Sequence, residues 1–128
     1  MSYDAAKSET NALLNLGRKI GIAGLATQDF DLVYASAHAV NSFCDQFESV
    51  DLTLEERFYF MQLIVASLDE ALRKAVPSAC DSEQRVERLL ARNIVDYEYI
   101  VDYWSRTGVD VDLRVAPMMQ RLKSALNK

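Results

Sequence analysis

The sequence predicts an all-α fold, namely an antiparallel up-down bundle of four long helices plus a short C-terminal helix. Apolar residues recur at spacings of three and four along most of the chain, which is typical of amphipathic helices. Only two prolines and four glycines interrupt the pattern. The stretches between helical patterns are short, which favours antiparallel neighbours. Without a repeat or a flexible linker, residues 1–128 are expected to form a single domain.

The first two expected helices cover about residues 2–25 and 28–48. The apolar side of the first includes Leu13, Leu16, Ile20 and Ala23. That of the second includes Phe30, Val33, Ala37, Val40, Cys44 and Phe47. Gly17, Gly21 and Gly24 share one side of the first helix, which indicates close approach of another segment or fraying.

The third expected helix is opened by a capping box, in which Thr53 is the N-cap and Glu56 follows three residues later. Pro77 is expected to end it. Its apolar seam consists of Leu54, Phe58, Met61, Val65, Leu68, Leu72 and Ala75. Phe60 and Leu63 lie off this seam, and a second copy of the protein is one candidate to cover them, so a homodimer is possible.

The fourth expected helix begins near Asp81 or Ser82 and ends before Gly108. Its seam consists of Val86, Leu90, Asn93, Tyr97, Ile100 and Trp104, flanked by Leu89, Ile94 and Val101. Asn93 is the one polar residue there, and a buried asparagine is expected to fix helix register. The following "VDVDLRV" alternates with period two and predicts a short extended segment. A last helix then opens at Pro117 and reaches about residue 127.

Composition and charge limit the cellular compartments and the classes of partner that we expect. The sequence contains no run of about 18 apolar residues, so no membrane span is expected. Residues 1–10 lack a basic start followed by an apolar stretch, so a secretory signal is not expected. Two cysteines without an export signal favour a reducing, cytoplasmic setting. A net charge of −5 argues against a nucleic-acid partner, because phosphate binding depends on Lys and Arg.

Catalytic and metal chemistries lack their residues. His38 is the only histidine, so neither a nucleophile–base pair nor a di-iron helical site has its ligands. Neighbouring carboxylates such as Glu55 and Glu56 diverge by roughly 100° around a helix and do not form an acid pair. We therefore expect a protein without enzymatic activity, metal or cofactor.

The charge is concentrated in one segment, since residues 28–52 contain five acidic residues and no lysine or arginine. Helical spacing places one set of polar residues on the face opposite the apolar side. This acidic face consists of Asp31, Tyr34, His38, Asn41, Asp45 and Glu48. Surface helices usually mix charges of both signs, so the acidic face is either a solvated surface or a site for a basic partner.

A second spare face is predicted on the fourth helix, where Arg92, Tyr99 and Tyr103 fall on one flank with Arg88 and Val95. Tyrosine and arginine are enriched at interface hot spots. The alternative is that a neighbouring helix, such as the C-terminal one, covers at least one of the tyrosines.

These observations favour a small acidic protein-binding module. Its most specific form is an inhibitor, immunity or antitoxin-like protein that neutralises a basic enzyme through the acidic, tyrosine-containing face. The first alternative is a dimeric helical regulator or adaptor that inhibits nothing. The second is an enzyme or small-ligand binder with a pocket between helices near Asn93, Tyr97 and Trp104.

Overall fold

The computed structural model describes residues 3–27, 29–108 and 110–126, and in these ranges the chain is all-helical. The helices are α1 Tyr3–Ile20, α2 Phe30–Val33, α3 Val40–Ser49, α4 Leu54–Arg73, α5 Ala79–Arg92, the 3₁₀ helix η1 Ile94–Tyr97, α6 Glu98–Trp104 and α7 Ala116–Leu126. None of the described helices combines the length and apolar character needed to cross a membrane. The all-α prediction is confirmed, whereas the up-down bundle and the single domain stay predictions.

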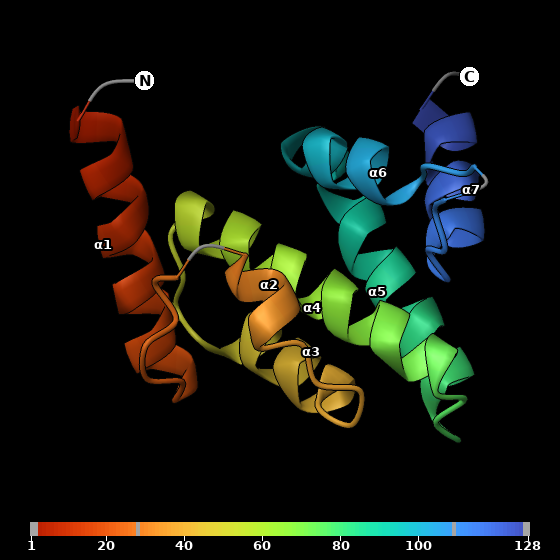
Figure 1. Ribbon diagram of the computed structural model, residues 1–128, viewed down its shortest axis with the longest axis horizontal. Coiled ribbons are helices and arrows are strands. Elements are labelled where there is room, and N and C mark those ends of the chain that lie inside the picture. Colours follow the sequence, from red (N-terminus) through yellow and green to blue (C-terminus); the bar gives the residue numbers. More distant parts are fainter. Residues whose placement is uncertain (1–2, 28, 109, 127–128) are drawn as a thin grey trace.

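The long helix α4 occupies the centre of the molecule. It crosses the middle of Figure 1, with α1 towards one end of the view and α6 and α7 towards the other. Helices α1, α2, α3 and α5 all contact it, and its sides are buried nearly all round. Phe60 and Leu63, which the sequence left uncovered, are 0% exposed. The chain itself therefore covers this patch, and it is not available to a second copy.

Both ends of α4 are fixed by hydrogen bonds that satisfy backbone groups of the helix ends. The predicted capping box is present, since the Glu56 N–H donates to Thr53 Oγ1 and the Thr53 N–H donates to Glu56 Oε1. Leu54, expected in the seam, is instead 72% exposed. The helix ends at Arg73, before Pro77, because Ala75 adopts the left-handed conformation (φ 54°) of a Schellman cap.

The second expected helix is broken into α2 and α3, so the prediction of one helix over residues 28–48 is wrong. Residues 34–39 between them are not helical. In this break the Ser36 N–H donates to the buried hydroxyl of Ser67 on α4 at 3.0 Å, which replaces a helical acceptor. Val33, expected in the core, is 63% exposed at the end of α2.

The fourth expected helix also breaks, at Asn93. This residue has non-helical dihedral angles (φ −136°, ψ 49°) and is exposed, so the prediction of a buried, register-setting asparagine is wrong. Beyond the break the predicted seam is confirmed, because Tyr97, Ile100 and Trp104 are buried in the common core. The chain passes through η1 into α6 and changes direction, as Figure 1 shows above α5.

The first helix ends at Ile20, five residues earlier than expected, and the chain folds back on it. A Cβ on Gly17 would lie 2.4 Å from the carbonyl oxygen of Ile22, so close approach explains this glycine. Gly21 leaves the helix with a φ of 83°. The expected extended segment near the C-terminus is reduced to an isolated bridge between Gly108 and Val111, with residue 109 outside the described part.

Candidate protein-interaction site

The structure divides the predicted acidic face into three parts. Because the helix breaks after α2, Asp31 and Tyr34 separate from the residues of α3. His38 lies exposed in the break, and no ion pair or hydrogen bond of its side chain is recorded among the described residues. Asn41, Asp45 and Glu48 remain together on α3. One continuous face, as the sequence predicted, does not exist.

The α3 part of the face is neutralised from within the chain. Arg85 of α5 donates through Nη2 to Asp45 Oδ1 at 2.7 Å and to Glu48 Oε1 at 2.8 Å. Its Nη1 also donates to the backbone oxygen of Asn41 at 3.2 Å. The hydrogen bonds to Glu48 and then to Asp45 raise the pKa of the Arg85 guanidinium. Helical spacing within one segment did not predict this role of Arg85, because the residue belongs to a neighbouring helix.

Tyr34 has a structural contact. Its hydroxyl donates to the backbone oxygen of Gly24 at 3.1 Å, and the ring is half-buried against the core. The contact ties the loop after α1 to the end of α2. Tyr34 is therefore a fixed part of the fold rather than a free interface anchor.

Asp31 meets Tyr99 and Tyr103 in a groove between α2, α4 and α6. Two adjoining hollows, of about 160 and 430 Å³, share Asp29, Asp31, Gln62 and Tyr99. The smaller is lined further by Leu32, Ile100, Tyr103 and Trp104, and the larger by Glu9, Thr27, Phe30, Phe58 and Tyr59. We call the two together the α2–α6 groove. It joins residues that the sequence placed on two separate faces.

Asp29 and Asp31 form an acidic wall of the groove. No ion pair to Asp29 or Asp31 is recorded among the described residues, and Asp29 adopts a left-handed conformation (φ 57°) ahead of α2. Burial raises the pKa of Asp31, and the negative charge of Asp29 adds to this effect. Backbone hydrogen bonds from Asp31 itself and from Leu32 only partly offset the rise. Glu9 adds a third carboxylate to the lining, so an added positive charge in the groove would be favourable.

The aromatic wall comes from α6. Tyr99 is 63% exposed beside Phe58, with the ring centroids 6.1 Å apart, and Tyr103 is 38% exposed against Trp104. The guanidinium of Arg106 lies 4.1 Å from the centroid of the Tyr103 ring, a cation–π distance. The expectation that the C-terminal helix covers one of these tyrosines is wrong, since neither is buried.

Arg92 does not belong to this groove. The break at Asn93 separates it from the two tyrosines, and Arg92 instead faces Glu48, with 3.8 Å between Nη1 and Oε2. With Asn93 it lines another hollow, whereas Trp104 lines the α2–α6 groove. The pocket predicted near Asn93, Tyr97 and Trp104 is therefore not one site.

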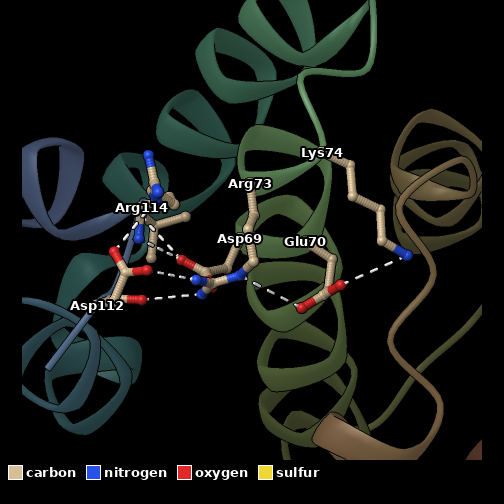
Figure 2. Close-up of polar contacts among 7 residues, drawn as sticks. Asp69, Glu70, Arg73, Lys74, Asp112 and Arg114 are labelled. Carbon is tan, nitrogen blue, oxygen red and sulfur yellow. Dashed lines mark hydrogen bonds and ion pairs between the residues drawn. The ribbon is translucent and has the colours of Figure 1, made fainter.

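A buried carboxylate on α4, that of Asp69, is joined to the segment that precedes α7 (Figure 2). Asp69 is 4% exposed, and its Oδ1 accepts hydrogen bonds from the backbone N–H groups of Arg114 and Val115, just before α7. Its Oδ2 accepts from Arg73 at 2.6 Å. Arg73 in turn donates to the side chain and backbone of Asp112 at 2.8 Å. Asp69 thus caps α7 from another helix.

The capped helix α7 packs against α6. Gln120 donates to the backbone oxygen of Ser105 at 3.3 Å, and Lys123 Nζ lies 3.3 Å from Asp102 Oδ1. Because α6 carries the tyrosines, the Asp69 contacts position the aromatic wall indirectly. Sequence spacing gives no signal for this anchor, because its partners are more than 40 residues apart.

In the described part of the chain, no three His, Cys, Asp or Glu side chains gather closely enough to hold a metal ion. The groove offers carboxylates, phenol rings and apolar surface, which suit recognition of a cationic group. In comparisons with known proteins, no family model, no curated protein and no solved structure matched the chain.

Proposed function

We propose that the protein is a small acidic protein-binding module whose α2–α6 groove receives a basic segment of a partner protein. The observation that supports this is the meeting of Asp29 and Asp31, for which no ion pair is recorded in the described residues, with the exposed Tyr99 and Tyr103. Elsewhere on the surface, as at Asp45, the carboxylate already forms an ion pair with an arginine of the same chain.

The groove suits an arginine or lysine side chain of the partner. A guanidinium can form paired hydrogen bonds with a carboxylate and stack on a phenol ring. Arg106 already occupies the second kind of position above Tyr103. An incoming cation also relieves the partly buried charge of Asp31, whose pKa is raised by burial. The net charge of −5 favours rapid encounter with a basic protein.

The more specific form of the proposal is an inhibitor, immunity or antitoxin-like protein that acts in the cytoplasm on a basic enzyme and has no catalytic activity of its own. Its support is the charge of the groove together with two free cysteines, Cys44 buried and Cys80 exposed, which suit a reducing compartment. The expected result is that the basic product of a neighbouring gene is toxic when expressed alone. Co-expression of the wild-type chain should restore growth, and a chain carrying both Asp29→Asn and Asp31→Asn should not.

A second candidate is a dimeric regulator or adaptor, favoured by exposed apolar residues, of which Leu32 lines the groove. Leu32 and Val33 on α2 are 57% and 63% exposed, and Val95 is 74% exposed. Sedimentation equilibrium distinguishes the two functions. A stable dimer that Leu32→Ser or Val33→Ser dissociates would favour the regulator, whereas a monomer at micromolar concentration favours the basic-partner module.

The direct test of the groove is an NMR titration with a defined arginine-rich peptide and a lysine-free acidic peptide as the negative probe. The basic peptide should shift amides around Asp31 and Tyr99 and bind less tightly to the Asp29→Asn, Asp31→Asn double variant. The matched control is the Asp45→Asn, Glu48→Asn double variant, which loses the same charge from the α3 face. Equal weakening by both pairs would mean that the peptide responds to net charge alone, and the groove proposal would be wrong.

A further inference from the structure

A separate hollow of about 190 Å³ lies where α3, α4 and α5 meet. It is lined by Phe47, Glu48, Arg57, Leu89, Arg92 and Asn93, none of which lines the α2–α6 groove. Two arginines and one glutamate line it, so the hollow is positively charged, whereas the groove is acidic. The arginines and the Asn93 amide offer hydrogen-bond donors, and Phe47 and Leu89 supply apolar surface. The lining therefore suits an anion.

Arg57 provides the strongest observation. Its Nε is buried and has no hydrogen-bond partner among the described residues, the one buried side-chain atom for which this is recorded. Buried polar groups in native proteins are nearly always satisfied, so this unpartnered atom is an unusual feature of the described chain. No ion pair of Arg57 with a carboxylate is recorded in the described residues either. The Arg57 side chain thus lines the hollow, and its buried Nε lies behind that lining without a partner among the described residues.

Arg92 and Asn93 add further donors. The nearest carboxylate oxygen to Arg92 is Glu48 Oε2 at 3.8 Å, which is longer than a charge-assisted hydrogen bond of about 2.7–2.9 Å. The other oxygen of Glu48 is already held by Arg85 at 2.8 Å. The single carboxylate in the lining is therefore shared, and it does not neutralise both arginines of the hollow.

We propose that this hollow binds a small oxyanion, a carboxylate or a phosphate, through the guanidinium groups of Arg57 and Arg92, with Asn93 as a further donor. An arginine presents its N–H groups in a planar fork that matches both anions. Phe47 and Leu89 keep water away from one side, which strengthens the interaction. The site is independent of the basic partner, because it shares no residue with the groove.

The test is a titration of the full chain with sodium phosphate, sodium acetate and sodium chloride at constant ionic strength and neutral pH. The ¹H–¹⁵N resonance of Arg57 Nε and the thermal midpoint are followed. Phosphate, acetate or both should give a saturable shift that chloride does not give. Saturation by phosphate alone identifies a phosphate site, and saturation by acetate alone identifies a carboxylate site.

Variants locate the site. Arg92 is exposed, so the Arg92→Gln variant should keep the core folded. The substitution should weaken anion binding about tenfold, the effect of losing one charge-assisted hydrogen bond. Arg88→Gln is the matched control, because it removes the same charge from the same helix outside the hollow. Arg57→Lys keeps the charge but lacks the planar guanidinium group and should abolish saturation. A response to chloride equal to that of both oxyanions, or equal affinities of the Arg92→Gln and Arg88→Gln chains, would overturn the proposal.

Discussion

The α3 face and the α2–α6 groove both contain carboxylates, yet the surroundings of these carboxylates differ. On α3, Arg85 reaches Asp45 and Glu48 from the neighbouring helix. In the groove, Asp29 and Asp31 face tyrosines, and no ion pair to them is recorded among the described residues. The comparison shows that a run of acidic residues says little about a partner by itself. What matters is whether the fold brings a cation from elsewhere in the chain.

The two regions also differ in what supports them. The α3 face rests directly on α4 and α5. The aromatic wall of the groove lies on the short helix α6, which is held by α7, and α7 is docked on α4 through Asp69. A change far from the groove should therefore affect it while leaving the α3 face intact.

The largest expected effect comes from Asp69→Ala. The change removes a buried carboxylate, leaves two backbone N–H groups without their acceptor and deprives Arg73 of one partner. We expect a loss of about 3 kcal/mol in the free energy of unfolding, the low end for breaking a buried pair, because Arg73 keeps Asp112. Urea denaturation measures the loss. Hydrogen exchange should accelerate in α6 and α7 more than in α3 and α5.

The control is Glu70→Ala, the next residue on α4. Its carboxylate is about a third exposed and lies 3.6 Å from both Arg73 and Lys74, so its loss should cost less than about 1 kcal/mol. If hydrogen exchange after Asp69→Ala accelerated equally on both sides of the molecule, Asp69 would stabilise the whole fold rather than the groove wall.

An intermediate effect is expected from Arg85→Met, which keeps the aliphatic stem and removes the cation of the α3 face. Because Asp45 and Glu48 are 70% and 39% exposed, solvent screens both pairs, and we expect a loss of about 1 kcal/mol. The variant should also convert the α3 face into a second site for the arginine-rich peptide. Calorimetry should then give two binding sites in place of one. Arg88→Met, with no ion pair recorded in the described residues, serves as the control and should retain one site.

Periodicity predicted the helical class and much of the core, because these depend on contacts a few residues apart. The capping box of α4 and the buried seam of Tyr97, Ile100 and Trp104 are examples. The breaks near residue 36 and at Asn93 were missed, because neither contains proline or glycine. At the first break, the Ser36 N–H takes its acceptor from Ser67, a contact across 31 residues that no local pattern reports.

The candidate site could be predicted only in pieces. The sequence identified Asp31, Tyr99 and Tyr103, but it placed Asp31 on one face and the two tyrosines on another. It joined Asp31 to residues of α3 and the tyrosines to Arg92, which lie outside the groove. Asp29 was missed because it precedes the apolar pattern rather than alternating with it, and its left-handed conformation appears only in the structure. Where a helix breaks, residues that helical spacing predicts on one face lie apart, and residues from distant segments of the chain come into contact.

The smallest expected effect compares the two regions most directly. An Asp→Asn substitution should change the free energy of unfolding in opposite directions in the two regions. Asp45→Asn removes an ion pair with Arg85 and should lower the free energy of unfolding at pH 7 by about 0.5 kcal/mol. Asp31→Asn removes a partly buried charge and should raise it by a similar amount, about 0.5 kcal/mol, because Asn keeps an acceptor for the backbone.

The pH dependence of the Asp31→Asn gain follows from the raised pKa of Asp31 in the folded protein. Below the pKa of the unfolded chain, about 3.9, the carboxyl is protonated in both states and costs nothing. As pH rises through the higher folded pKa, ionisation is less favourable in the folded state, so the wild type is destabilised. Urea denaturation at pH 3.5 and pH 7 should therefore show a gain at pH 7 alone. A loss at pH 7 like that of Asp45→Asn would mean that a cation in the groove already pairs with Asp31, and the distinction between the two regions would disappear.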